Sequence, residues 1–310
     1  MSAVSPTGEP RRNPASGSEY SRYFTAPTQR RGRGSAPSHA MDRIRIVAVF
    51  GVPRTGTSHL FEVIRNADNL MVYKELFHPA AAFGIQHRPE DLEELSTELR
   101  QDFGSIFDER LRTWLQAHPE RFLDFALERP YGRNKHLIFK IFPGHLKAES
   151  IKQTILSRPD TASIIVQRRP IDAYISGVKA EQLGRHRRID TTAVAPLLST
   201  TAYVRWWNSR KDWYDDVKGW LDDQGVSYRF MTYENDILGE PVLVFRKFIM
   251  TCRELGVALH HTKWTHDGLD KQDLQLDYDK KVGNWPAFRD EIFKKGHEKL
   301  LYEYFLDPCS

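Results

Sequence analysis

Cysteine is scarce in this chain of 310 residues, which contains only Cys252 and Cys309. Two cysteines are too few for the disulfide framework that stabilises small secreted domains. The first 40 residues also lack the apolar segment of a secretory signal peptide. We therefore expect the protein to work in a reducing compartment, the cytoplasm.

Long hydrophobic runs are missing as well. No stretch approaches the roughly 18 consecutive apolar residues of a membrane-spanning helix, so we expect no membrane span. Hydrophobic residues make up 40% of the chain and charged residues 28%, as in soluble globular proteins. A chain of this length can bury a substantial core.

A basic excess is absent from most of the chain, although the net charge is +4. Residues 1–40 contain six Arg and two Glu, so that 39 basic and 39 acidic residues remain for the rest. Proteins that bind nucleic acid usually carry a surplus of basic side chains that neutralise phosphates. We therefore expect no nucleic-acid partner.

Residues 1–40 are rich in Ser, Pro, Gly and Arg and poor in aliphatic side chains. Such a segment buries too little apolar surface to offset the entropy lost on ordering. We predict a disordered tail at 1–40 and a single domain at 41–310. The tail is either a dispensable extension, an arginine-rich docking arm or a targeting peptide.

Short apolar runs alternate with amphipathic patterns from residue 44 onward. Several runs are apolar at consecutive positions, as in strands buried on both faces. The predicted strands are residues 44–50, 70–74, 136–142, 162–167 and 226–232. The predicted helices are 57–66, two or three pieces within 90–128, 146–157, 171–183, 199–222, 241–256 and 287–305. The alternation predicts an α/β fold with a central, mostly parallel sheet flanked by helices, in three layers.

A glycine-rich turn follows the first predicted strand, in the stretch GVPRTGTS (residues 51–58). Gly51 and Gly56 have the spacing of a phosphate-binding loop, but Thr57 stands where nucleotide-hydrolysing enzymes have a Lys. Backbone N–H groups in such a turn favour an anion, and Arg54 adds a permanent charge. The absent Lys argues against a triphosphate and for a monophosphate or phosphosulfate group.

A second strand end carries cations in place of an acid. In phosphate-loop NTPases a strand of this kind ends in an Asp that holds Mg²⁺. Here the stretch SIIVQRRP ends in Gln167, Arg168 and Arg169. We therefore predict that this edge of the sheet binds a second phosphate and that the site uses no metal.

These two stretches carry a resemblance to the sulfotransferases that use 3′-phosphoadenosine 5′-phosphosulfate (PAPS). PRTGTS (residues 53–58) resembles the family's 5′-phosphosulfate loop, and RRPIDAYIS (residues 168–176) resembles its 3′-phosphate motif. SYRFMTYENDILGEP (residues 227–241) is similar to a late strand and turn of the family. The resemblance implies a P-loop-like three-layer sandwich, PAPS as sulfate donor and 3′-phosphoadenosine 5′-phosphate (PAP) as product.

The resemblance also implies roles for individual residues. The 5′-phosphosulfate would be held by a set in the loop, namely Arg54, Thr55, Gly56, Thr57 and Ser58. Arg168 and Ser176 would hold the 3′-phosphate, since a guanidinium fork suits a phosphate dianion; otherwise Arg168 makes a surface ion pair. Asp172 is expected to stabilise the helix N-terminus. In YDKKVGNWPAF (residues 278–288), Lys280 or Lys281 would close over the 3′-phosphate.

Sulfuryl transfer needs a base that takes the proton of the acceptor hydroxyl. Many cytosolic sulfotransferases have a His two residues after a strand Lys, but here Phe142 follows Lys140 at that position. Bacterial carbohydrate and glycolipid members place a Glu about twenty residues after the loop. Glu75 lies 21 residues after Arg54, and we predict it as general base, with His78 or His145 as alternatives. A purely structural ion pair of Glu75 with Lys74 or an Arg is the remaining interpretation.

Lys140 is predicted to stabilise the sulfuryl group or the bridging oxygen during transfer, because fixed charges of this kind contribute strongly to catalysis. The other interpretation is a strand-end lysine that reaches solvent. The helical region at 87–128 is predicted to cover the acceptor. The acceptor is expected to carry a hydroxyl, as carbohydrates and glycolipids do, while the oligomeric state cannot be read from the sequence.

Two other functions fit parts of the pattern. An ATP-dependent small-molecule kinase would explain the glycine-rich loop, but Thr57 and Gln167 stand where it needs a Lys and an acid. A non-catalytic nucleotide-binding or scaffold protein could also keep the loop. Donor binding without Mg²⁺ would distinguish a sulfotransferase from a kinase. Sulfate transfer to an acceptor would distinguish a sulfotransferase from a non-catalytic protein.

Overall fold

The strands predicted from the sequence form one sheet at the centre of the protein. The computed structural model describes residues 44–184, 190–269 and 273–308. The predicted tail at 1–40 lies outside these residues. All described residues belong to one compact unit, His39–Ser310.

Five parallel strands make up the sheet, in the order β2-β3-β1-β4-β5. Their bounds are β1 Ile46–Phe50, β2 Leu70–Val72, β3 His136–Ile141, β4 Thr161–Gln167 and β5 Tyr228–Thr232. The central strand β1 pairs with β3 and β4, so that Ile46 lies between Leu137 and Thr161. The predicted α/β class is confirmed, and the sheet is wholly parallel.

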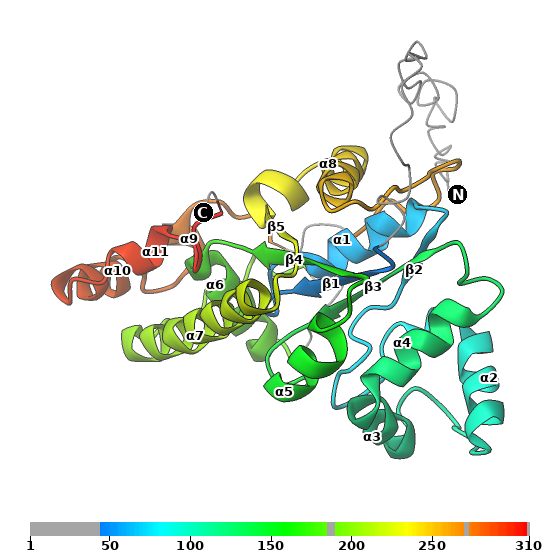
Figure 1. Cartoon of the computed structure of the whole chain (residues 1–310). Coiled ribbons are helices and arrows are strands. Elements are labelled where there is room, and N and C mark those ends of the chain that lie inside the picture. The colour runs from blue at the N-terminus through cyan, green and yellow to red at the C-terminus, as the bar shows by residue number, and fades with distance from the viewer. Residues whose placement is uncertain (1–43, 185–189, 270–272, 309–310) are drawn as a thin grey trace, which may run out of the picture. The chain divides into compact units, whose positions relative to one another are not determined.

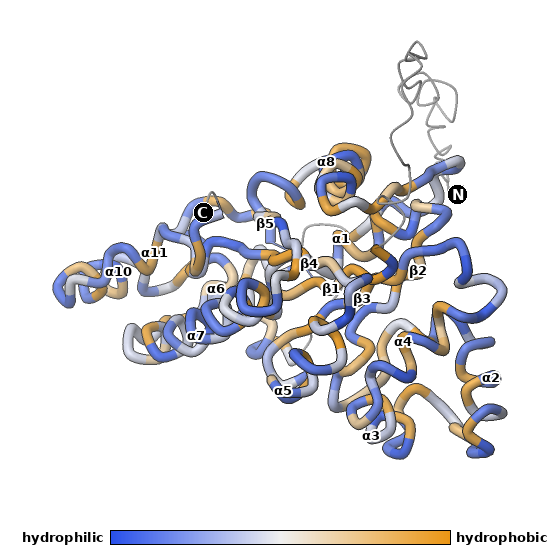
Figure 2. The backbone as a smooth tube through the Cα atoms, in the orientation of Figure 1, coloured by the Kyte–Doolittle hydropathy of each residue, from blue (hydrophilic) through white to orange (hydrophobic). Residues whose placement is uncertain are grey.

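Helices cover both faces of this sheet (Figure 1). On one face, α1 (Thr57–Val63) and α8 (Pro241–Glu254) pack on Val47 and Val49 of β1. On the other face, α4 (Pro119–Glu128), the π-helical segment η4 (Ile151–Leu156) and α7 (Thr200–Gln224) pack on Ala48 and Phe50. The alternation of side chains along a strand produces the two separate cores. Figure 2 shows the tube largely hydrophobic through the central strands.

The remaining helices extend the fold on two sides. Next to α4 lie α2 (Pro89–Leu99) and α3 (Glu109–Ala117), which complete the predicted helical region at 87–128. The other set packs against the first half of α7 and comprises α6 (Pro170–Gln182), α9 (Tyr278–Lys281), α10 (Trp285–Lys294) and α11 (Lys299–Tyr302). Among the described residues, no helix is long and apolar enough to cross a bilayer.

Two predicted helices are wrong in detail. The helix predicted at 287–305 is split into α10 and α11, because the chain turns at Gly296 with a φ of 68°, a left-handed conformation that suits glycine. The helix predicted at 146–157 is a short α5 (Ala148–Ser150) that continues as the π-helical η4.

Candidate donor and acceptor site

The glycine-rich loop connects β1 to α1 at the carboxyl edge of the sheet. Thr55 fixes its shape, because its buried hydroxyl donates to the Val52 carbonyl at 2.8 Å. Gly56 has a φ of 82°, and a side chain there would collide with the ring of Tyr233. The predicted need for glycine at this position is therefore explained by a left-handed backbone and by a close neighbour.

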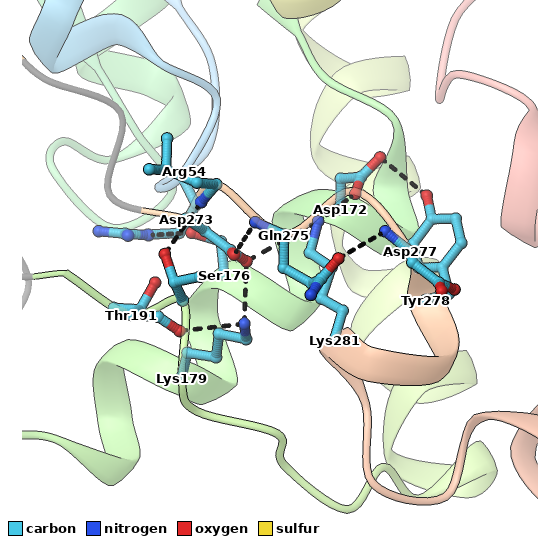
Figure 3. Close-up of polar contacts among 12 residues, drawn as sticks. Arg54, Asp172, Ser176, Lys179, Thr191, Asp273, Gln275, Asp277, Tyr278 and Lys281 are labelled. Atoms are coloured by element: carbon cyan, nitrogen blue, oxygen red, sulfur yellow. Dashed lines mark hydrogen bonds and ion pairs between the residues drawn. The ribbon is translucent and has the colours of Figure 1, made fainter.

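The side chain of Arg54 points from this loop toward α6, a contact that the sequence did not predict. Its Nε donates to Ser176 Oγ at 2.9 Å, and its φ is 74° (Figure 3). Ser176 belongs to α6, the helix that follows β4. Arg54, predicted for the 5′-phosphosulfate, and Ser176, predicted for the 3′-phosphate, thus touch each other, although 122 positions separate them in the chain.

Arg168 lies beside the same loop. One guanidinium nitrogen donates to the Arg54 carbonyl at 3.0 Å, and the guanidinium carbon lies 4.2 Å from the centre of the Tyr233 ring. Its Nε is buried and has no hydrogen-bond partner among the described residues. A buried charged donor without a partner is costly, and this Nε makes Arg168 a candidate for binding an anion. The interpretation of Arg168 as a surface ion pair is not supported, since its contacts are with the loop and Tyr233.

Lys281 is held by an acid on α6. Its Nζ lies 2.8 Å from Asp172 Oδ1, and Tyr278 donates to Asp172 Oδ2 at 3.0 Å (Figure 3). Burial raises the pKa of Asp172, but the charge and hydrogen bond of Lys281 outweigh it and lower that pKa. Asp172 was expected to stabilise a helix N-terminus; it sits in the first turn of α6 and also neutralises Lys281. Lys280 is exposed on the neighbouring position.

A second buried ion pair lies about two turns further along the same face of α6, and the sequence analysis missed it. Lys179 is fully buried, and its Nζ lies 2.9 Å from Asp273 and 3.1 Å from the Thr191 carbonyl (Figure 3). Asp172, Ser176 and Lys179 share one face of the helix because they lie four and three positions apart. That periodic polar pattern was the signal available in the sequence.

Lys140 of β3 reaches the loop from the neighbouring strand. Its side chain is 1% exposed, and Nζ lies 3.4 Å from both Thr57 Oγ1 and Ser58 Oγ. The interpretation of Lys140 as a lysine that reaches solvent is therefore wrong. Thr57 occupies the place of the NTPase lysine, and the ammonium of Lys140 brings a positive charge to the same loop.

Glu75 follows β2 and forms an ion pair with Lys140. Its Oε1 lies 3.1 Å from Lys140 Nζ, and its side chain is 12% exposed. Lys74 is not its partner, since Lys74 pairs with Glu62 of α1. The structure thus joins the predicted base, the predicted stabilising lysine and the loop hydroxyls in one set of contacts.

His78 and His145 lie next to Glu75, and their rings are 5.1 Å apart. His145 Nε2 is 3.9 Å from Glu75 Oε2. Burial lowers the pKa of His145 to about 4, so this side chain is neutral at physiological pH. These three residues each offer a potential metal ligand within 4.8 Å of the others.

Helix α3, in the region 87–128 that was predicted to cover the acceptor, contacts the turns that carry this cluster. Gln116 donates to the carbonyls of Phe77 and His145, both at 3.4 Å, and Arg112 donates to the Pro79 carbonyl. The side chains of α3 therefore join the turns that carry Glu75, His78 and His145.

Gln167 ends β4 at the position of the NTPase acid. Its amide nitrogen donates to the Leu306 carbonyl at 3.1 Å, and its amide oxygen accepts from the Leu306 N–H at 2.8 Å. The side chain is fully buried. Gln167 thus anchors the C-terminal segment instead of facing the loop.

No family model and no curated protein matches the chain. Nine chains of solved structures are similar to it, among them the following three. The sulfotransferase domain from the curacin biosynthetic pathway is 13% identical, with a TM-score of 0.41 over 81% of this chain and 90% of its own. A sulfotransferase from Alicyclobacillus acidocaldarius is 18% identical, with a TM-score of 0.39 over 84% and 95%. Retinol dehydratase in complex with androsterone and the inactive cofactor PAP is 16% identical, with a TM-score of 0.31 over 83% and 79%. At these identities and TM-scores the reaction has to be inferred from the residues of the site.

Proposed function

We propose that this protein transfers a sulfuryl group from PAPS to a hydroxyl acceptor. The observation that carries the proposal is the position of Lys140, whose ammonium lies 3.1 Å from Glu75 and 3.4 Å from the hydroxyls of Thr57 and Ser58. This one charge connects the loop expected to bind phosphosulfate with the carboxylate expected to act as base. A sulfuryl group that moves from donor to acceptor has to pass between the phosphosulfate loop and the carboxylate of Glu75.

The residues present fit the two phosphate groups of the donor. The loop from Arg54 to Ser58 would hold the 5′-phosphosulfate with its backbone and hydroxyl donors. Arg168 and Ser176 would hold the 3′-phosphate, and the buried Nε of Arg168 without a partner supports this assignment. The hydrogen bond from Arg54 to Ser176 joins a residue assigned to the first group with one assigned to the second, which supports a single donor held by both sets. We propose that Lys281 contributes at longer range, since Asp172 already neutralises it, and that the exposed Lys280 reaches the 3′-phosphate.

The reaction then divides between two side chains. Glu75 takes the proton of the acceptor hydroxyl while the acceptor oxygen forms a bond to sulfur. The bond from sulfur to the phosphate oxygen breaks, and PAP leaves. Lys140 stabilises the negative charge on the transferring group, and such a fixed donor contributes about 3 kcal/mol. No step requires a metal.

We propose a carbohydrate or glycolipid hydroxyl as acceptor, with the reaction in the cytoplasm. A carboxylate base in place of the strand histidine supports this class, as in the resemblance described above. Phe142 fills the position of that histidine, and Gln116 of α3 donates to the carbonyls of Phe77 and His145.

A small-molecule kinase is the second candidate, and it is disfavoured by the surroundings of β4. Gln167 is occupied by the Leu306 backbone, and Arg168 and Arg169 follow it, so that this strand end offers cations where a kinase places its Mg²⁺ ligand.

Calorimetry with PAP in EDTA tests the donor site. We expect PAP to bind without Mg²⁺ and ATP to bind weakly with or without it. Saturable ATP·Mg²⁺ binding together with no PAP binding would instead support a kinase.

Transfer of labelled sulfate from PAPS to a panel of glycans, glycolipids and phenols tests the reaction. We expect Glu75→Gln to abolish transfer and to leave PAP affinity nearly unchanged. Glu62→Gln is the matched control, because Glu62 also pairs with a buried lysine, at side-chain exposures of 17% and 8%. Unchanged transfer by Glu75→Gln would remove this residue from the mechanism.

A further inference from the structure

Segment 273–281, which leads into α9 and includes it, is attached to α6 at two points (Figure 3). At the first point, Lys179 Nζ lies 2.9 Å from Asp273 Oδ2. At the second point, Lys281 Nζ lies 2.8 Å from Asp172 Oδ1. Because both points are on one helix, they fix the position of the segment and also its direction along α6.

Ser176 lies between these two attachment points. Asp172 precedes it by four positions and Lys179 follows it by three, so the three side chains share one face of α6. At a rise of about 1.5 Å per residue, the attachment points are roughly 10 Å apart along the helix. Segment 273–281 therefore borders the place where Arg54 reaches Ser176, which is the place assigned to the 3′-phosphate.

Asp273 connects the two ends of the segment. Its Oδ1 accepts from the Gln275 N–H at 3.0 Å, which forms a local turn at the start of the segment. Its Oδ2 lies 3.9 Å from Lys281 Nζ, in addition to the contact with Lys179. One carboxylate thus joins the start of segment 273–281, its end and α6.

Lys179 also connects the segment to the chain that follows α6. Its Nζ donates to the Thr191 carbonyl at 3.1 Å. Nearby, the Leu274 N–H donates to Thr192 Oγ1 at 3.1 Å. Loss of the Lys179 ammonium would therefore loosen both the chain after α6 and segment 273–281.

Neither partner of the Lys179–Asp273 pair is suited to bind a phosphate. Lys179 is fully buried, so a ligand cannot reach its ammonium. The carboxylate of Asp273 would repel a phosphate, and it balances the charge of Lys179. Desolvation offsets much of the attraction within a buried ion pair, so a gain in stability does not by itself account for this one.

We propose that Lys179 and Asp273 are positioning residues for the 3′-phosphate of the donor. They hold segment 273–281 beside Ser176, and this arrangement lets the site distinguish PAPS from adenosine nucleotides that lack the 3′-phosphate. The inference rests on the proposed function, which assigns Ser176 to that phosphate. The exposed Lys280 belongs to the same segment, so its reach toward the phosphate depends on the same ion pair.

Calorimetry with two ligands separates positioning from a general loss of structure. PAP carries a 3′-phosphate and adenosine 5′-phosphate (AMP) lacks it, whereas both offer a 5′-phosphate to the loop at 51–58. The wild-type chain is compared with Lys179→Met, with Asp273→Asn and with both changes together. Lys74→Met is the matched control, because Lys74 is also a buried lysine that pairs with an acid.

We expect each single variant to weaken PAP binding by roughly threefold to thirtyfold, the range for residues that act on a ligand through others, with AMP affinity unchanged. The double variant should bind PAP no more weakly than the weaker single variant, since both changes remove one contact. Lys74→Met should keep the wild-type ratio of PAP affinity to AMP affinity.

A wild-type ratio in Lys179→Met and Asp273→Asn, including equal losses for both ligands, would overturn this inference and leave the proposed function intact. A wild-type chain that does not bind PAP would show that the proposed function itself is wrong.

Amide hydrogen exchange of the wild-type chain gives an answer that does not depend on folding of the variants. At saturating ligand, we expect PAP to slow exchange across segment 273–281 and AMP to leave it unchanged. Equal protection by both ligands, or PAP binding without protection of this segment, would contradict the proposal.

Discussion

Replacing Lys140 by Met removes the charge of this side chain and keeps most of its shape. Methionine keeps an unbranched apolar stem of similar length, which suits the contacts with the Phe61 and Phe142 rings. The substitution removes an ammonium that is 1% exposed and leaves the Glu75 carboxylate, 12% exposed, without its partner at 3.1 Å. The expected damage comes mainly from that uncompensated carboxylate.

The loss of stability can be estimated from this burial. Removing one partner of a buried ion pair costs about 3–5 kcal/mol, and the residual exposure of Glu75 places the value near the lower end. For a chain of this size, a loss of about 3 kcal/mol lowers Tm by roughly 6–12 °C. Sulfuryl transfer should fall by about 10²–10³ if Lys140 also stabilises the transferring group.

A double-mutant cycle with urea unfolding measures the pair itself. We expect Lys140→Met combined with Glu75→Gln to cost less than the sum of the single losses, with a coupling of about 1–3 kcal/mol. Lys74→Met and Glu62→Gln form the control cycle on a pair of similar burial. Additive losses, or a Lys140→Met variant that keeps wild-type transfer, would refute the reasoning about this charge.

Three further predictions concern the loop and the cluster. Arg168→Gln should weaken PAP binding by roughly 10- to 100-fold, the size of one charged hydrogen bond, when measured by calorimetry; unchanged affinity would place the 3′-phosphate elsewhere. The lowered pKa of His145, about 4, means that the unfolded chain takes up a proton below pH 6.5 that the folded chain resists. Stability should therefore be lost by up to about 3 kcal/mol as pH falls from 6.5 toward 4, and urea midpoints for His145→Gln should lack this slope. Gly56→Ala should cost at least about 1–2 kcal/mol for the left-handed backbone and abolish PAP binding, because the added carbon meets Tyr233; normal binding would show that the loop tolerates a side chain.

The sheet was predictable because its signal is local. Five apolar runs separated by amphipathic helices appear in the sequence as they do in the structure, with ends displaced by no more than a few residues. Burial on both faces makes such strands apolar at every position, and this pattern depends little on the rest of the fold. The helix break at Gly296 and the π-helical segment η4 were not predicted from the sequence, since they depend on turn geometry and packing.

The candidate site residues were predicted one by one from the sequence, but their contact partners were not. Arg54 was assigned to one phosphate and Ser176 to the other, and the hydrogen bond between them depends on how α6 packs beside the loop. Likewise, the sequence indicated that Glu75 might pair with Lys74, which instead meets Glu62. Lys74 and Glu75 lie in a bend after β2, and their partners come from α1 and β3, two elements distant in the sequence.

By itself the sequence determined the order of strands and helices, the glycine turn and the two arginines at the ends of β1 and β4, because each depends on neighbouring residues. Only the tertiary structure decided that Lys140 supplies the charge missing at Thr57 and that His145 presents Nε2 to Glu75. The physical reason is the parallel sheet, which gathers the carboxyl ends of strands distant in sequence at one edge. At that edge, the protonation state of a buried charged group or ring nitrogen depends on neighbours that are distant in the sequence, and no local sequence pattern reveals them.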